Sequence, residues 1–292
     1  MLCQKGMMLR ALIIMMAMVC SAAGEEKTAN INTVMMESTC KIVGTNSLGS
    51  GFVIGKADSA KKDVFHFVLV TAHHVLAQCQ GENIYLVLRK LKDEANQQWE
   101  RITVPVRIRD SSRDLWTKHP DVDLAAMLVQ LPDKCIRFII PDSLLLTDDK
   151  IKEFEIGPGT ELLCLGYPLG DEANPQGFPI LRSGKIASYP LLPTKATKSF
   201  LFDFSVFRGN SGGPVYLYEK ASLCGGLIQG IMGIVTIERN VTQHTEQLYE
   251  RRETVTPLAL GEVIHASFIK ELIDGRLLSD FGHIRPSANS HR

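Results

Sequence analysis

The sequence predicts an all-β fold in two halves, with one short helix near the C-terminal end. Short apolar runs recur along the chain, several of them alternate apolar and polar residues, and turn-forming residues separate them. Each run is too short for a typical helix. The 292 residues are enough for one large all-β domain or two smaller ones with a substantial core.

The expected strands fall into two groups on either side of the segment 132–159. The first group comprises residues 41–43, 51–54, 64–70, 84–88, 102–108 and 124–129. The second group comprises residues 161–165, 184–188, 215–218 and 230–236. Residues 238–256 are charged and irregular, so we expect a long surface loop there.

The expected helix lies close to the end of the chain. Ser267 can cap its start, and Gly275 can end it. Between them, apolar residues share one face, namely Phe268, Ile269, Leu272 and Ile273. The tail over residues 281–292 is polar and is expected to be loose.

The N-terminus has the pattern of a secretory signal peptide over residues 1–23. Lys5 and Arg10 precede an apolar run over residues 11–20, and small residues follow at 21–24. A run of this length is shorter than the about 20 residues that cross a bilayer, although an uncleaved anchor is the alternative. Nothing later resembles a membrane span. We therefore expect an exported protein, periplasmic or secreted, that begins near Gly24.

Charge and cysteine content narrow the function classes. The 32 basic residues balance the 32 acidic ones, so no basic surplus favours a nucleic-acid partner. Beyond the signal peptide five cysteines remain, at positions 40, 79, 135, 164 and 224, which is an odd number. Cys40 and Cys79 are candidates for one disulfide.

The stretch FRGNSGGP, residues 207–214, contains a candidate nucleophile, Ser211. The glycines around it allow a tight turn and close approach to a substrate, and successive N–H groups in such a turn can stabilise an oxyanion. A serine needs an adjacent base to act as a nucleophile. Alone, the stretch is more typical of a glycine-rich β-turn.

Two other stretches supply the remaining groups. His73 and His74 follow a strongly apolar strand, and Asp121 and Asp123 precede another. Singly, such a histidine is more often structural and such an aspartate more often a turn residue. The order His, Asp, Ser at strand–loop junctions is the order that a catalytic triad built across two barrels requires.

The chain resembles serine peptidases of the chymotrypsin fold, and in particular the HtrA (Deg) type. The matching motifs are GSGFVI (49–54), TAHHV (71–75), DLA (123–125), LGYPLG (165–170), RSGKI (182–186) and the stretch 203–214. Together they cover roughly residues 35–275. The resemblance implies a trypsin-like fold of two six-stranded antiparallel β-barrels, over residues 30–131 and 155–262, within a protease domain at 24–280 that ends with a helix at 266–274.

The resemblance also implies roles for individual residues. In the motif T-A-x-H-V the base is the fourth residue, which selects His74, and the acid is followed by Leu-Ala, which selects Asp123. Ser211 is then the nucleophile, and the N–H groups of Gly209 and Ser211 form the oxyanion hole.

The implied substrate pocket consists of Ser205, Val206, Ile237 and Glu238. A neutral serine at its base argues against a demand for Arg or Lys and favours small or medium apolar residues. Glu238 near the rim is the counter-argument, because a carboxylate favours a basic residue. Relatives of the HtrA type commonly carry PDZ modules after the protease, whereas here the chain stops shortly after the helix, and no such module is expected.

A second motif, KIVGT at residues 41–45, resembles the activation site of a protease zymogen. In such zymogens a new N-terminus pairs with an aspartate before the nucleophile, but this chain has Asn210 there, which cannot ionise. We therefore expect KIVGT to be the first strand and activity to need no zymogen cleavage.

The sequence does not support the three function classes equally. The favoured function is an exported serine endopeptidase that acts on polypeptide substrates and uses no metal or cofactor. The alternative is a catalytically silent peptide-binding or chaperone-like protein of the same fold. A metal-binding protein using His73, His74 and Cys79 is disfavoured by the ligand spacing.

Overall fold

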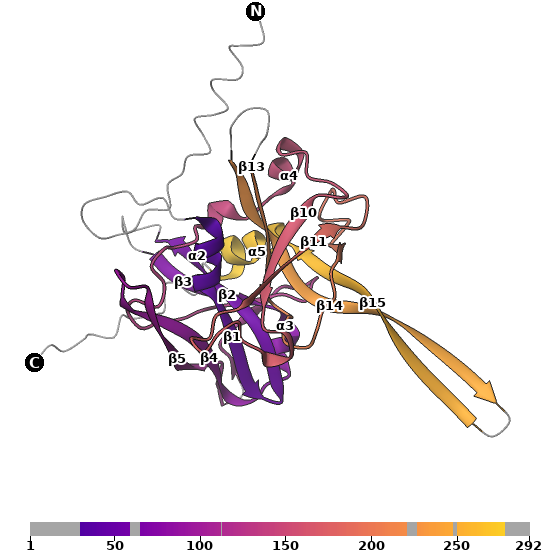
Figure 1. Cartoon of the computed structure of the whole chain (residues 1–292), viewed down its shortest axis with the longest axis horizontal. Coiled ribbons are helices and arrows are strands. Elements are labelled where there is room, and N and C mark those ends of the chain that lie inside the picture. Colours follow the sequence, from indigo (N-terminus) through magenta and orange to yellow (C-terminus); the bar gives the residue numbers. More distant parts are fainter. Residues whose placement is uncertain (1–29, 59–64, 112, 221–226, 248–249, 278–292) are drawn as a thin grey trace, which may run out of the picture.

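The computed structural model describes residues 30–58, 65–111, 113–220, 227–247 and 250–277. Within these residues the first half of the chain forms a seven-stranded sheet and the second half a closed barrel. Figure 1 shows the two halves side by side, with a long hairpin projecting from the body. The expected signal peptide and the tail at 281–292 lie outside the described residues.

The seven-stranded sheet has the strand order β5-β4-β1-β2-β3-β9-β8. Its strands are β1 (Thr39–Thr45), β2 (Ser47–Ala57), β3 (Phe65–Thr71), β4 (Gln80–Asp93), β5 (Gln98–Arg107), β8 (Thr117–Lys118) and β9 (Ala125–Leu128). Every expected strand of the first half has a counterpart here. A separate two-stranded sheet pairs β6 (Arg109–Asp110) with β7 (Arg113–Asp114).

The predicted closure of this first sheet into a barrel is not confirmed. Among the described strands, β5 and β8 stand at opposite ends of the order and do not pair with each other. The chain after β5 forms the small β6–β7 ribbon, and β8 is only two residues long. Too little extended backbone therefore remains at that edge to complete a ladder of hydrogen bonds.

The second half forms the closed six-stranded barrel that the sequence predicts, with the order β10-β11-β12-β15-β14-β13. Its strands are β10 (Glu161–Gly166), β11 (Ile180–Ile186), β12 (Ser199–Asp203), β13 (Pro214–Lys220), β14 (Leu227–Gln247) and β15 (Glu250–His265). All the neighbouring pairs are antiparallel.

The prediction of a loop at residues 238–256 is wrong, because β14 and β15 continue through this segment as a paired ribbon. Their register runs without interruption from Asn240 opposite Pro257 to Gln247 opposite Glu250. In Figure 1 this part of the hairpin extends away from the barrel. The sequence carries no clear alternation of apolar and polar residues over this ribbon, which is why periodicity did not predict it.

Short helices connect the strands. They are α2 (Ile31–Ser38), α3 (His73–Ala77), α4 (Asp148–Glu153), α5 (Ala266–Leu272), the single turns η1 (Asp142–Leu144) and η2 (Pro168–Gly170), and η3 (Ile273–Leu277). The C-terminal helix is confirmed, but it begins after His265 instead of Ser267. The Ser267 hydroxyl donates a hydrogen bond to Thr194 Oγ1 instead of capping.

Two apolar cores hold the molecule together. The larger one joins the first half to barrel residues such as Leu165 and Tyr216, and the smaller one lies within the second half. The C-terminal helix buries Phe268, Ile269 and Leu272 in the larger core. The connecting segment is also tied to both halves, since Pro141 bridges Gly55 and Leu145 bridges Ile231. The two halves are therefore joined both by the segment that precedes the second barrel and by the helix that follows it.

The four described cysteines are all buried thiols, so the expected Cys40–Cys79 disulfide is absent. Cys79 contacts the backbone instead, with its Sγ 3.7 Å from the carbonyl oxygens of Gln80 and Asn83. Burial raises the pKa of Cys40 to about 12, which keeps its thiol protonated.

Candidate active site

His74 lies where a buried strand passes into a short helix. Strand β3 ends at Thr71, and α3 begins at His73 with Val75 and Leu76 turned into the core. This packing fixes the backbone that carries the imidazole, while the His74 side chain remains about one-third exposed. The predicted base is therefore held by the core and open to solvent.

Asp123 binds His74 through two contacts. Its Oδ2 lies 2.6 Å from His74 Nδ1, and its Oδ1 accepts a hydrogen bond of 2.9 Å from the His74 backbone N–H. Partial burial of Asp123 works against ionisation, but these hydrogen bonds outweigh it and hold the pKa of the carboxyl below its ordinary value. The structure thus brings together the two residues that sequence reasoning selected as base and acid.

The two neighbouring candidates have different contacts. His73 Nδ1 is 3.8 Å from Asp123 Oδ1, beyond hydrogen-bonding distance, and its ring packs against Trp116 at 5.2 Å between centroids. Asp121 is exposed, and its carboxylate lies 3.9 Å from Lys198 Nζ. Geometry therefore distinguishes His74 from His73 and Asp123 from Asp121 as the motifs do.

Ser211 lies on a turn that only glycine permits at two positions. Gly209 and Gly212 have φ values of 97° and 85°, in the left-handed region that favours glycine. A Cβ at Gly209 would also lie 2.2 Å from the carbonyl oxygen of Tyr167. The glycines of the FRGNSGGP stretch are thus required by both backbone conformation and close packing.

The Ser211 turn packs against the segment that carries His74. A Cβ at Gly212 would lie 2.9 Å from the Ala72 nitrogen. Gly49 lies between the two segments, since a Cβ there would be 2.6 Å from Val75 and 3.2 Å from the Ser211 carbonyl oxygen. Residues from both halves of the chain therefore meet at this point.

The Ser211 hydroxyl points to a backbone acceptor in this structure. Ser211 Oγ donates a hydrogen bond of 2.9 Å to the carbonyl oxygen of Thr236 in β14. Within the described part of the chain, no hydrogen bond joins Ser211 Oγ to His74. Of the three predicted catalytic residues, His74 and Asp123 are thus in contact, whereas the Ser211 hydroxyl points to Thr236.

The two backbone N–H groups expected to form the oxyanion hole are both available. Over the described residues, neither the Gly209 nor the Ser211 nitrogen donates a hydrogen bond to another protein group. By contrast, the Asn210 nitrogen donates to the Phe207 carbonyl oxygen at 2.9 Å and the Gly213 nitrogen to that of Asn210 at 2.9 Å. Asn210 itself is buried, with 2% of its surface exposed.

The expected pocket residues come from two segments. Ser205 is held by Arg182, whose Nη1 donates a hydrogen bond of 2.8 Å to the Ser205 carbonyl oxygen. Val206 is buried against the backbone of β15, where a Cβ at Gly261 would lie 2.7 Å from it. Ile237 and Glu238 continue β14 opposite residues 262 and 261, but their side chains lie outside the described part of the structure.

Sequence reasoning missed Ser50, Thr236 and Tyr167 as residues of this site. Ser50 is fully buried, and its backbone N–H donates a hydrogen bond of 2.8 Å to the Ser211 carbonyl oxygen. Its position inside the GSGFVI motif is a signal in the sequence, but the contact itself depends on a residue far along the chain. Thr236 has no such signal.

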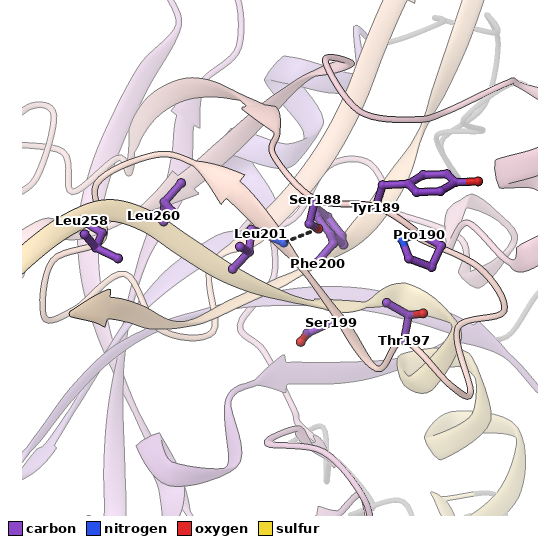
Figure 2. Close-up of a pocket in the computed structure, with 9 residues that line it drawn as sticks. All are labelled: Ser188, Tyr189, Pro190, Thr197, Ser199, Phe200, Leu201, Leu258 and Leu260. Atoms are coloured by element: carbon purple, nitrogen blue, oxygen red, sulfur yellow. Dashed lines mark hydrogen bonds between the residues drawn. The ribbon is translucent and has the colours of Figure 1, made fainter. Parts of the chain in front are cut away.

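A separate pocket of about 480 Å³ lies on the outer face of the second barrel. Figure 2 shows its nine lining residues, which come from the segment after β11 and from β12 and β15 and include Tyr189, Leu201 and Leu258. None of the predicted site residues lines it. The lining combines Leu201 with Phe200, the buried residue that precedes it on β12.

Among the described residues, no helix is long and apolar enough to cross a membrane. The same part of the chain contains no group of three or more His, Cys, Asp or Glu side chains arranged to hold a metal ion.

Comparison with known proteins identifies a family. Residues 49–225 match the family model described as a trypsin-like peptidase domain, and a comparison with curated proteins gives no match. The chain is also similar to the crystal structure of an Rv3671c mutant in an inactive form, from M. tuberculosis H37Rv, with 18% identity, a TM-score of 0.42, and coverage of 92% of this chain and 100% of that one. Because the family model spans more than half of the sequence, the chain belongs to the trypsin-like peptidase domain family.

Proposed function

We propose that this protein is a serine endopeptidase of the HtrA type that cleaves polypeptides through Ser211, His74 and Asp123. The observation that carries the proposal is the double contact of Asp123 with His74, at 2.6 Å to the ring and 2.9 Å to the backbone N–H. This contact fixes the imidazole with Nδ1 toward the carboxylate, which leaves Nε2 as the proton acceptor.

The proposed reaction proceeds through an acyl-enzyme. Ser211 Oγ attacks the carbonyl carbon of the scissile bond while His74 Nε2 takes the hydroxyl proton. The C–N bond then breaks as His74 returns this proton to the leaving amine, and a water molecule, activated by the same base, hydrolyses the ester. Asp123 stabilises the imidazolium throughout. The N–H groups of Gly209 and Ser211, which have no acceptor among the described residues, stabilise the negative oxygen of each tetrahedral intermediate.

The resting orientation of Ser211 bears on the alternative function. Its hydroxyl must leave the Thr236 carbonyl and rotate toward His74 before it can react. Such a rotation about one side-chain bond is fast compared with typical turnover. A protein in which this rotation did not occur would bind peptides without cleaving them. This is the catalytically silent alternative, and it predicts that Ser211 does not react.

A fluorophosphonate probe distinguishes the two functions. Phosphonylation of Ser211 displaces fluoride and leaves a stable covalent adduct, so mass spectrometry reports the labelled residue directly. We expect one adduct on Ser211 in the wild type and none in Ser211→Ala. Peptide binding without labelling would establish the silent alternative.

We further propose cleavage after small or medium apolar residues such as Val, Ala or Leu. The proposal is supported by the neutral Ser205 at the base of the pocket and by Val206, buried against Gly261. Cleavage profiling with a peptide library, beside the Ser211→Ala protein as control, tests it. Dominant cleavage after Arg or Lys would contradict the proposal and assign the specificity to Glu238.

Export is part of the proposed function. The basic and apolar pattern of residues 1–23 supports a cleaved signal peptide and a periplasmic or secreted enzyme. N-terminal sequencing of the protein from an expressing cell should give a mature start near Gly24. A chain that keeps its first 23 residues would contradict cleavage.

A further inference from the structure

We propose that Tyr167 and Ser50 position the oxyanion hole, and that Arg89 connects Tyr167 to the helix α2. This inference rests on the proposed function, because it assigns a role to residues that support the Gly209 and Ser211 N–H groups. "Oxyanion turn" here denotes residues 207–213 and "support turn" residues 167–170. None of the three residues has been placed in the catalytic triad or in the substrate pocket.

The orientation of the Gly209 N–H depends on the carbonyl group of the preceding residue. In a trans peptide the N–H and the C=O point in opposite directions, so fixing the Arg208 carbonyl fixes the Gly209 N–H. The Leu169 nitrogen in the support turn donates a hydrogen bond of 2.6 Å to the Arg208 carbonyl oxygen. Reversal of this peptide plane would lose that bond and point a carbonyl oxygen into the hole.

The support turn has a conformation that requires external support. Leu169 has a φ of 55°, in the left-handed region that a leucine rarely adopts. Its side chain is 68% exposed, so packing of the leucine itself contributes little. The anchor of the turn is its first residue, Tyr167, which is completely buried.

The Tyr167 side chain is held by a buried arginine. Arg89 Nη1 donates a hydrogen bond of 2.8 Å to Tyr167 Oη. The tyrosine hydroxyl in turn donates one of 3.1 Å to the carbonyl oxygen of Gly177. Arg89 Nη2 reaches the carbonyl oxygens of Met36, Glu37 and Thr39 at 2.6–2.8 Å. These carbonyls lie at the C-terminal end of α2, where a cation is favoured.

Ser50 joins the two turns directly. Its Oγ accepts a hydrogen bond of 3.1 Å from the Tyr167 nitrogen and donates one of 2.6 Å to the Gly209 carbonyl oxygen. Its own nitrogen donates to the Ser211 carbonyl oxygen at 2.8 Å. A single buried residue of the first half thus holds the support turn and both ends of the Gly209–Ser211 segment.

These contacts provide the ordering that the ion pair of a newly released N-terminus provides once a protease zymogen has been cleaved. Asn210 cannot make such a pair. Instead, the end of α2 is connected through Arg89 to Tyr167, and from the support turn to the Arg208–Gly209 peptide. The predicted consequence is a selective loss of transition-state stabilisation when this connection is weakened.

The test compares Tyr167→Phe with a matched control, Tyr216→Phe. Both tyrosines are fully buried, but the Tyr216 hydroxyl has no hydrogen-bond partner among the described residues. We expect Tyr167→Phe to lower kcat about tenfold, short of the 10²–10³ caused by outright loss of an oxyanion donor. The KM should stay unchanged within about twofold, because ground-state binding is not affected. Tyr216→Phe should change neither constant.

A second readout measures the oxyanion hole itself. A peptide aldehyde forms a hemiacetal with Ser211 that places an oxygen in the hole, so its affinity should fall in Tyr167→Phe and Ser50→Ala by the same factor as kcat. Equal affinities in the wild type and in both variants would overturn the proposal. So would an equal loss in Tyr216→Phe, because this would reflect general destabilisation.

Hydrogen exchange keeps the test independent of turnover. The N–H groups of Asn210, Gly212 and Gly213 donate to backbone carbonyls within or beside the oxyanion turn. Their exchange, followed by mass spectrometry on peptides covering 205–213, should be faster in Tyr167→Phe and Ser50→Ala than in the wild type or Tyr216→Phe. A wild type that neither cleaves peptides nor reacts with the probe would refute the proposed function alone, whereas unchanged exchange in both variants would refute the positioning role.

Discussion

The adjacent His73 and His74 share one carboxylate but differ in their contacts with it. Only His74 reaches Asp123 at hydrogen-bonding distance, at 2.6 Å, whereas His73 is 3.8 Å away and packs on Trp116. We therefore expect His74→Ala to abolish fluorophosphonate labelling and peptide turnover, and His73→Ala to retain most activity. Equal losses in two folded variants would contradict this assignment.

The corresponding pair of aspartates gives a second prediction. The Asp121 carboxylate is exposed and lies 3.9 Å from Lys198 Nζ, whereas Asp123 accepts two hydrogen bonds from His74. Asp121→Ala should leave kcat nearly unchanged, while Asp123→Ala should lower it by about 10⁴ because the imidazole loses its tautomer and orientation. Steady-state kinetics on one peptide measures both. A large loss of kcat in Asp121→Ala would show that the assignment of Asp123 as the acid is wrong.

The buried imidazole of His265 predicts a dependence of stability on pH. Its side chain is completely buried beside Phe200, and burial lowers its pKa from the ordinary 6.5 to about 4. The unfolded chain therefore takes up a proton before the folded one does, so the free energy of unfolding should fall between pH 6.5 and pH 4. A shift of this size corresponds to roughly 3 kcal/mol.

Chemical denaturation across this pH range, with His265→Phe as the comparison, measures the effect. The variant should show a flatter dependence between pH 4 and 6.5, while above pH 7 the two proteins should respond to pH in parallel. If the free energy of unfolding depended on pH equally in the variant and the wild type, groups other than His265 would be the cause.

The residues of the site differ in how far sequence predicts them. His74, Asp123 and Ser211 lie in short motifs whose order reveals them. Ser50, Tyr167 and Thr236 act through contacts with backbone atoms far away in sequence, and a backbone acceptor can be any residue type. No local pattern therefore predicts those contacts.

At the scale of single elements, strand β1 decides whether KIVGT is an activation site. Its residues Lys41 and Ile42 pair with β2 on one side and with β4 on the other. Ile42 is fully buried and Lys41 is 9% exposed. A protease must bind an extended, detached segment, so the bond between them should resist trypsin for as long as the protein stays folded.

Limited trypsinolysis followed by intact mass measurement tests this resistance. We expect the protein with an uncut Lys41–Ile42 bond to react with the fluorophosphonate probe. Labelling that begins only after cleavage at this bond would contradict the non-zymogen interpretation. Substituting Lys41 is a poorer test, because its Nζ donates a hydrogen bond of 3.0 Å to the Gly170 carbonyl oxygen in the support turn.

The C-terminal helical segment is held to the first half by alternating charges. Asp142 Oδ2 accepts hydrogen bonds from Lys56 at 2.7 Å and from Lys270 at 3.2 Å, and Asp274 contacts the same two lysines. Burial disfavours the charge on Asp142, but the two lysines outweigh it and lower the pKa of the carboxyl. The lowered pKa means that this contribution is present above the ordinary value of 3.8 and is lost as pH falls below it.

Asp142→Asn should therefore destabilise the protein by about 1 kcal/mol at neutral pH. The difference from the wild type should vanish in strong acid, where the wild-type carboxyl is also protonated. Thermal denaturation at several pH values measures it, and Asp149→Asn, an exposed carboxylate in α4, serves as the control. A difference that persists at low pH would exclude the ion pairs as its cause.

Apolar periodicity predicted those elements that pack a buried face. Strands such as β3 carry a dense apolar run, so they can be predicted without knowledge of the strands beside them. Helix α2 was missed, although Asn30 caps it and Ile31, Val34 and Met35 are spaced for one buried face. This segment has only two helical turns, too few for its spacing to stand out beside the apolar run at residues 11–20.

At the scale of the whole molecule, closure is the property that sequence patterns predict least well. The two halves have similar strand patterns, yet only the second closes among the described residues. Closure depends on strand length and stagger at a sheet edge, and β8 is too short to supply them. The division into two halves was predictable, whereas the packing of α5 in the core that the first half shares with the barrel was not.

The β14–β15 ribbon also determines how the molecule moves in solution. Because the paired strands project well beyond the barrel in Figure 1, the particle is elongated. Its rotational diffusion should be anisotropic, and its frictional ratio should exceed that of a compact protein of 32.3 kDa. Small-angle X-ray scattering should give a distance distribution with an extended tail. Replacing residues 241–256 by a short turn should remove this tail, and a symmetric distribution for the intact chain would show that the ribbon folds back onto the body.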